Sequence, residues 1–341
     1  MIIITIMNEF SNSVNNEIIT TYKNYDCSID GVLSQLEKDG VAVVPNILNE
    51  EEIKNMRNGI WDTVEHLSSR CEMPIDRNNE ETWKTWYKLL PTHYMLMQTY
   101  SIGHAQFIWD IRQNPKVSNV FAKIWSCKPE ELITSYDAVS FHLPPETTGI
   151  GWYNNNDWMH VDASYTRRGF ECVQGFVTGY DINDGDASLT LLESSNKYHS
   201  DFGDEFNIQD EIDWVRLEKE DLDFYYKKGC KRHNVKASAG SLILWDSRTV
   251  HCGMEPLETR DNPNFRLVTY VCMTPRSWMP DEYVEFRRSA LEEMFMTNHC
   301  PHRPRLFPKQ PNTYSGRRIV PDVPEMPKPK LTELGKKLAG F

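Results

Sequence analysis

Two side chains that could share a metal ion stand two positions apart in the segment His160-Val161-Asp162. In an extended chain, residues i and i+2 point to the same face, so this imidazole and this carboxylate project into one space. A second imidazole would complete a set of two histidines and one carboxylate. Such a set covers one face of an octahedral iron(II) ion and leaves positions open for a cosubstrate and oxygen. The segment therefore indicates a non-haem iron site.

The chain has ten histidines and contains a second His-x-Asp segment, His199-Ser200-Asp201, so neither segment is decisive by itself. For both, the alternative is a surface histidine beside an acidic residue. The surroundings favour the first segment, because aromatic residues precede His160 and a strand-forming segment follows Asp162. His199 instead follows the polar run 194–197, which predicts a solvated turn.

A third metal ligand should come from a later strand. Residues 241–246 form an apolar run entered through Gly240, and His251 follows just past this predicted strand. The alternative for His251 is a histidine whose nitrogens are satisfied within the core. Taken with the first two ligands, His251 predicts a metal set of His160, Asp162 and His251.

An arginine opens the next strand-forming run, residues 265–271. A buried strand tolerates a charge poorly unless the charge is paired, and the guanidinium of Arg266 matches a carboxylate with two parallel hydrogen bonds. The far carboxylate of 2-oxoglutarate is such an anion. The alternative is an arginine at the rim that pairs with an Asp or Glu of the protein. A His-x-Asp segment, a later histidine beside a strand and an arginine in a further strand occur together in this order much more rarely than any one of them occurs alone.

The elements that must position these residues change in character along the chain. Helices are predicted first, one following Asn49, which with Glu52 forms a capping box, and one over residues 117–124. Short strands follow, rich in β-branched and aromatic residues, at 132–143, 171–182, 188–193, 241–246 and 265–274. The charged stretch 209–228 predicts a helix inserted among them. This order predicts an α+β fold with a two-sheet roll buttressed by helices.

We expect three parts in the chain. Residues 1–28 are polar and Asn-rich and predict a flexible arm, and residues 29–300 predict a single domain, helical to about 130 with its core over about 132–275. Residues 301–341 are Pro-rich and predict an extended surface tail that ends in a short helix over 331–338.

The amino-acid composition disfavours some classes of binding partner. The chain of 341 residues has 37 basic and 49 acidic residues, a net charge of −12, which disfavours nucleic acid and acidic membranes as partners. No two of its eight cysteines are closer than 20 positions, which indicates reduced thiols in a cytoplasmic protein. The apolar N-terminus is too short for a signal peptide, and no later stretch approaches the length of a membrane span.

At these residues the chain resembles the phytanoyl-CoA dioxygenase-like family of iron(II)- and 2-oxoglutarate-dependent oxygenases, over roughly residues 35–275. The similar segments are the strand and helix from Gly40 to Leu67, the two-proline step Leu143-Pro144-Pro145, Trp158 to Asp162, Gly240 to His251, and Phe265 to Thr269. The resemblance implies a double-stranded β-helix (a jelly roll, cupin-like) with helices packed on one sheet.

Carried across, the resemblance implies that His160, Asp162 and His251 bind Fe(II) and that Arg266 anchors 2-oxoglutarate. It places Gln98 in a second contact with the cosubstrate, the alternative being an ordinary surface glutamine. The chain departs from the family pattern at 193–197, a loop expected to border the substrate, and at Gly253, where a serine near the cosubstrate is usual.

The implied activity is a dioxygenase that uses O2 to hydroxylate a C–H bond of a small organic substrate, while 2-oxoglutarate is decarboxylated to succinate and CO2. Two other functions stay open. One is a non-catalytic jelly-roll binding protein with a vestigial metal site. The other is a cupin-like metalloenzyme that does not use 2-oxoglutarate. The sequence predicts neither the substrate nor the oligomeric state.

Overall fold

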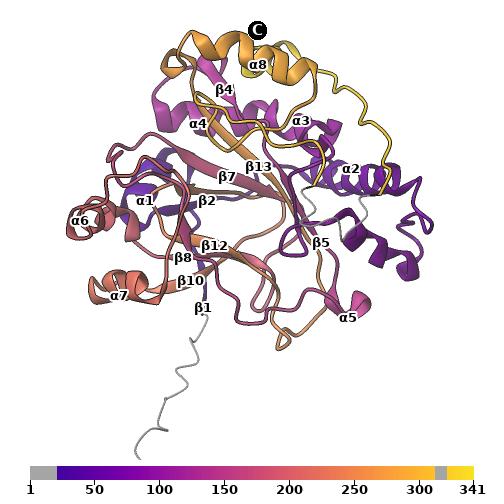
Figure 1. Ribbon diagram of the computed structural model, residues 1–341, viewed down its shortest axis with the longest axis horizontal. Coiled ribbons are helices and arrows are strands. Elements are labelled where there is room, and N and C mark those ends of the chain that lie inside the picture. The colour runs from indigo at the N-terminus through magenta and orange to yellow at the C-terminus, as the bar shows by residue number, and fades with distance from the viewer. Residues whose placement is uncertain (1–20, 312–320) are drawn as a thin grey trace, which may run out of the picture.

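The computed structural model describes residues 21–311 and 321–341, which form an α+β fold with two large sheets (Figure 1). The first sheet has the order β1-β10-β8-β12-β6-β9. Its strands are β1 (Thr21–Asn24), β6 (His160–Val161), β8 (Ser188–Leu192), β9 (Val215–Arg216), β10 (Arg232–Lys236) and β12 (His251–Met254). The second sheet has the order β2-β11-β7-β13-β5-β3, and β4 also pairs with β13. Its strands are β2 (Val41–Val44), β3 (Leu96–Met97), β4 (Leu132–Thr134), β5 (Val139–His142), β7 (Val173–Thr178), β11 (Leu242–Asp246) and β13 (Arg266–Pro275).

The second sheet is buried on both faces, and its strands divide their side chains between two cores. On β2, Val41 and Val43 join the core between the two sheets, whereas Ala42 and Val44 join the core under the helices. Leu189 and Leu191 of the first sheet close the inner core. The alternation follows from the two-residue period of a strand. The inner core lies between the sheets, and its Phe176, Leu189 and Trp245 also line the cavity described below.

Helices cover the outer face of the second sheet, as the sequence predicted. They are α1 (Val32–Asp39), α2 (Glu50–Ser68), α3 (Gln106–Arg112) and α4 (Pro115–Trp125). In Figure 1, α3 and α4 lie above β7, α2 lies to the right of β7 and β13, and β8, β10 and β12 lie below those strands. The predicted capping box at the start of α2 is present, since Asn49 accepts from the Glu52 N–H and Glu52 accepts from the Asn49 N–H.

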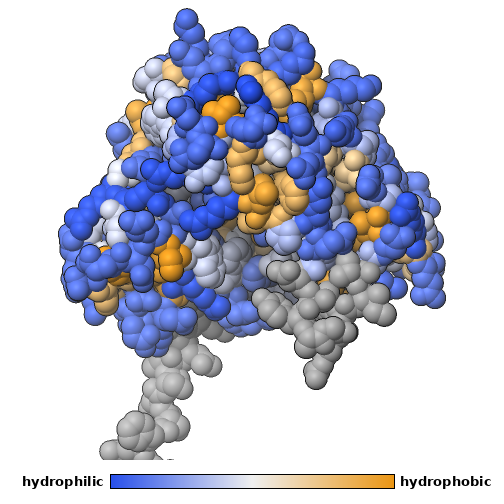
Figure 2. All heavy atoms as spheres, turned by 45° about the horizontal axis from the view of Figure 1, so that its top comes forward, coloured by the Kyte–Doolittle hydropathy of each residue, from blue (hydrophilic) through white to orange (hydrophobic). Residues whose placement is uncertain are grey.

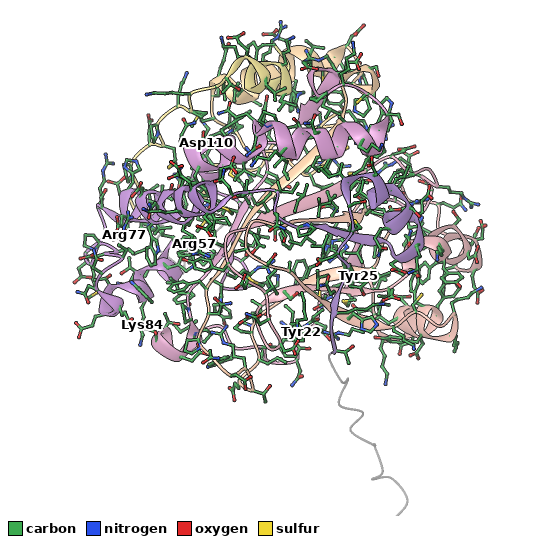
Figure 3. All side chains as sticks on the ribbon, turned by 180° about the vertical axis from the view of Figure 1, so that it is seen from behind. Tyr22, Tyr25, Arg57, Arg77, Lys84 and Asp110 are labelled. Atoms are coloured by element: carbon green, nitrogen blue, oxygen red, sulfur yellow. The ribbon has the colours of Figure 1, made fainter. Side chains whose placement is uncertain are left out.

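The described part of the predicted N-terminal arm is wrongly assigned, because residues 21–24 form a strand of the first sheet and the residues that follow pair with β2 of the second sheet. Strand β1 pairs in parallel with β10, and the Tyr22 hydroxyl donates to the Asp186 carbonyl at 2.7 Å. Tyr25 is buried and donates to the Glu193 carboxylate at 2.9 Å. Figure 3 labels both tyrosines where the chain enters the sheet. The remaining part of the predicted arm, 1–20, lies outside the described residues.

Further helices follow among and after the strands: α5 (Pro145–Thr148), α6 (His199–Glu205), α7 (Lys219–Lys227), α8 (Glu282–Glu292) and α9 (Glu333–Ala339). The stretch 209–228 is not one helix, because it contains both the edge strand β9 and α7. The predicted terminal helix is present as α9, and its Ala339 carbonyl accepts a 2.7 Å hydrogen bond from Tyr136. Within the described residues no helix is long and apolar enough to cross a membrane. Figure 2 shows a face on which hydrophilic residues predominate and hydrophobic ones gather in small patches.

Candidate metal and cosubstrate site

Two neighbouring strands of the first sheet bring His160 and His251 together. They are register partners on β6 and β12, and their ring centroids lie 4.4 Å apart. Asp162 follows β6, and its N–H donates to the Ser247 carbonyl at 3.0 Å, which holds the end of the strand in place. Its Oδ2 lies 3.5 Å from Nε2 of His160 and 3.3 Å from Nε2 of His251. One ligand atom from each residue lies within 4.8 Å of the others, an arrangement that can hold a single metal ion.

The tautomers of both histidines are set by backbone carbonyls. Nδ1 of His160 lies 3.0 Å from the Trp158 carbonyl, and Nδ1 of His251 lies 2.8 Å from the Thr249 carbonyl. A carbonyl can only accept, so each Nδ1 carries the proton and each Nε2 keeps its lone pair for a metal. The Trp158 indole stacks on the His160 ring at 4.8 Å and fixes its plane. The site thus has two imidazole donors and one carboxylate donor, a set suited to iron.

Asp162 is held in the ionised form that a metal ligand requires. Burial opposes its ionisation, but the neighbouring imidazoles of His299 and of the two ligand histidines outweigh burial, so its pKa lies well below the ordinary carboxyl value. Gln174 of β7, in the opposite sheet, donates to Oδ2 of Asp162 at 2.8 Å. The pKa of His251 is lowered, first by burial and then by His160, which keeps the imidazole neutral. Both effects favour metal binding.

Trp245 of β11 also reaches the site from the second sheet. Its indole N–H donates to Nε2 of His251 at 3.1 Å. A metal ion bound at that nitrogen would replace this hydrogen bond. Sequence reasoning did not single out Gln174 or Trp245. A signal existed for the glutamine, because an amide within a buried apolar strand must find a partner.

Arg266, the first residue of β13, is buried with its guanidinium 5.2 Å from the Phe176 ring centroid. It donates to the Ala187 carbonyl at 3.1 Å and to the Ser140 hydroxyl at 3.4 Å. Within the described residues Arg266 forms no ion pair. The alternative, an arginine that pairs with an Asp or Glu of the protein, is therefore not observed there. Burial lowers its pKa, and the opposing effects of Tyr270 and Glu255 offset only part of that shift. This environment fits an anionic ligand.

All of these side chains face one cavity of about 450 Å³. The predicted residues on its wall are Gln98, His160, Asp162, His251 and Arg266. Gln98, which follows β3, is therefore not an ordinary surface residue, although no hydrogen bond within the described residues shows what it binds. Gly253 also lines the cavity, as the resemblance implied.

Four lining residues come from a segment that the sequence placed at or beyond the end of the domain: Asn298, His299, Arg305 and Phe307. The predicted boundary at 300 therefore divides one site. The segment is fixed by backbone hydrogen bonds from the Thr297 N–H to Tyr136 and from the Phe307 N–H to Met296. Its sequence carries no strand or helix period, so only its contacts reveal its position.

Two expectations about other residues are wrong. His199 is not in a solvated turn, because it is fully buried, stacks on Tyr165 at 4.5 Å and lies with Nε2 3.1 Å from the Ala163 carbonyl. The loop 193–197 does not line the cavity. Its Ser195 is buried and accepts from the Val250 N–H at 2.8 Å, so the loop supports the strand that carries His251.

Comparisons with known proteins agree with the fold. No protein-family model matches the chain. The chain is 23% identical over 278 residues to the Ava biosynthesis cluster protein O of Aspergillus versicolor, covering 79% of this chain and 85% of that protein. The putative oxidoreductase from Salmonella typhimurium LT2 superposes with a TM-score of 0.58 at 12% identity, covering 94% of this chain and 86% of that one. The two proteins share a fold.

A weaker likeness concerns the epimerase SnoN, solved in complex with Fe3+, alpha ketoglutarate and nogalamycin RO. The TM-score is 0.44 at 13% identity, with 72% of this chain and 83% of SnoN covered. A likeness this weak supports no comparison of individual residues, so the site must be interpreted from the side chains of this chain.

Proposed function

We propose that the chain is an iron(II)- and 2-oxoglutarate-dependent dioxygenase whose two sheets form a double-stranded β-helix. The observation that carries the proposal is one cavity that holds both a compact His–Asp–His set and a buried guanidinium without an ion-pair partner among the described residues. A metal set alone is compatible with many cupin-like metalloenzymes. The unpaired Arg266 favours an anionic cosubstrate and therefore favours 2-oxoglutarate over that alternative.

The residues fit both groups. His160, Asp162 and His251 would hold iron(II), since two neutral imidazoles and one ionised carboxylate are directed into one space. Arg266 would pair with the far carboxylate of 2-oxoglutarate, and Gln98 would contribute a second contact from the same cavity. When bound, the iron and 2-oxoglutarate would activate O2 for oxidation of a C–H bond, with release of succinate and CO2.

The chain itself positions and shields these groups. Gln174 holds Asp162 by its hydrogen bond, and Trp158 holds the plane of His160. Phe176 and Trp245 line the cavity beside Arg266 and His251 and exclude water from them. Exclusion of water strengthens the pairing between Arg266 and a bound carboxylate.

We propose hydroxylation of a small organic molecule as the outcome, because the carboxylate ligand Asp162 is present, whereas iron halogenases of this type lack it. The Aspergillus versicolor relative is described as a biosynthesis cluster protein, which supports a small-molecule substrate. We further propose a cytoplasmic enzyme and a membership close to the phytanoyl-CoA dioxygenase-like proteins. The catalytic unit extends beyond 300 to include Phe307.

The test is succinate formation from 2-oxoglutarate by purified protein supplied with iron(II) and candidate small molecules. The wild type should form succinate, and Asp162→Ala should abolish its formation. The matched control is Asp201→Ala, which removes the carboxylate of the other His-x-Asp segment and should leave succinate formation unchanged. Equal activity of Asp162→Ala and wild type would refute the ligand assignment. Iron binding without succinate formation would favour the non-catalytic binding protein.

A further inference from the structure

The charged groups of the cavity wall can be accounted for one by one. Asp162 belongs to the metal set, and Arg266 is assigned to the cosubstrate. Asp213 forms ion pairs with Arg167 and, at 3.4 Å, with Arg305. Asp137 is the remaining carboxylate of the wall, and within the described residues it has no ion-pair partner. His299 also lines the wall, and Asp137 is among the groups that raise its pKa, although the described residues show no ion pair between the two side chains. Once metal and cosubstrate are placed, Asp137 is therefore the carboxylate of the wall that remains without an ion pair.

Asp137 is held as a binding group would be. It precedes β5, its residue exposure is 9%, and one carboxylate oxygen accepts from the Ala138 N–H at 2.7 Å. Burial raises its pKa, while His299 and Arg112 act in the opposite direction. Arg112 donates to the backbone carbonyls of Gly103 and Asp137, not to the carboxylate. The described structure contains no hydrogen bond between this carboxylate and His299.

Aromatic rings stand on the same wall. Trp214, half exposed, lies with its ring 5.6 Å from that of His160, and Phe307 joins it from the C-terminal segment. His93 stacks on Trp158 at 4.5 Å, although its backbone lies in the left-handed region with a φ of 50°. Left-handed backbone in a residue other than glycine is strained and gathers at ligand-binding sites. Aromatic faces in a cavity that also holds a carboxylate attract a cation joined to a flat ring.

We propose that this cavity selects a substrate in which a protonated nitrogen, an amine or a guanidinium, is attached to a flat apolar ring system. The nitrogen would pair with Asp137, and the ring would lie against Trp214 and His93. The inference rests on the proposed function for its placement of Arg266, and it adds the class of substrate. An anionic substrate is disfavoured because Arg266 and Arg305 are both engaged.

The test compares tryptamine with indole-3-propionate, two probes that share one flat ring system and carry opposite charges at pH 7. Binding is measured by isothermal titration calorimetry on the full chain, both alone and with Mn(II) and 2-oxoglutarate. The variant is Asp137→Asn, which keeps an oxygen to accept from the Ala138 N–H. The matched control is Asp39→Asn, the same change at a buried carboxylate outside the cavity.

Wild type should bind tryptamine at least tenfold more tightly than indole-3-propionate, and Asp39→Asn should keep this preference. Asp137→Asn should reduce the preference to within about twofold while melting at a temperature close to that of wild type. Any of three results overturns the inference: equal or tighter binding of the propionate, a preference that survives in Asp137→Asn, or no binding of tryptamine. The calorimetry without metal and cosubstrate needs no turnover, so a failed succinate assay with an intact amine preference would reject only the proposed function.

Discussion

Replacing Arg266 by methionine should separate cosubstrate binding from stability. The guanidinium is buried without an ion-pair partner among the described residues, so its removal relieves a charge held away from water. The same removal leaves the Ala187 carbonyl without its donor, at a cost of about 1–3 kcal/mol. These effects oppose each other, and we expect the free energy of unfolding without ligand to stay within about 2 kcal/mol of wild type.

The loss in cosubstrate affinity should be much larger. Truncating one partner of a buried charge pair costs about 2–5 kcal/mol, which corresponds to a dissociation constant raised by roughly 30-fold or more. At a 2-oxoglutarate concentration of about 100 times the wild-type dissociation constant, binding should stabilise the wild type by about 2.7 kcal/mol. At the same concentration, Arg266→Met should gain about 1 kcal/mol or less.

The assay is thermal unfolding in Mn(II) with increasing 2-oxoglutarate, followed by the change in melting temperature. The control is Arg260→Met, because the Arg260 side chain is also buried but pairs with Glu146 and Asp186. That control should lose about 3–5 kcal/mol of stability yet keep its response to 2-oxoglutarate. If 2-oxoglutarate stabilises Arg266→Met as much as wild type, Arg266 does not bind the cosubstrate and the reasoning fails.

Two further predictions concern neighbours of the site. Gln174→Leu removes the hydrogen bond to Asp162, so the metal affinity, measured by titration, should fall by about 10- to 100-fold. An unchanged metal affinity would show that the amide of Gln174 does not orient Asp162. Burial raises the pKa of Glu255 from 4.5 to about 7, so its neutral form stabilises the fold below pH 4.5 and this stability is lost as the pH rises through 7. Between those limits, Glu255→Gln should gain up to roughly 3 kcal/mol over wild type in denaturant unfolding, and a constant difference across this range would contradict the shift.

Much of the scaffold could be predicted because its signals are local. The runs at 173–178 and 242–246 are rich in apolar residues and bounded by turn formers, and both form strands buried on both faces. The capping box of α2 depends on two residues three positions apart. His160 and Asp162 converge because the two-residue period of an extended chain is also a local property.

The rest depended on partners distant in the sequence. Strand β6 has two residues and β12 four, and each exists because of its neighbours in the sheet rather than its own composition. Strand β1 escaped prediction because polar Thr21–Asn24 is stabilised by pairing with β10. His199 is polar, yet stacking on Tyr165 and a carbonyl partner make its burial favourable. Phe307 reaches the cavity through contacts that no periodicity encodes.

The central claim is that one iron(II) ion and one 2-oxoglutarate occupy this cavity together, and its most direct measurement is the visible absorption spectrum under anaerobic conditions. Adding both to the wild type should produce the weak charge-transfer band of 2-oxoglutarate chelated to iron(II), at one equivalent of iron per chain. His251→Ala should lack the band. A wild-type spectrum without the band, or a band of full strength in His251→Ala, would contradict the account.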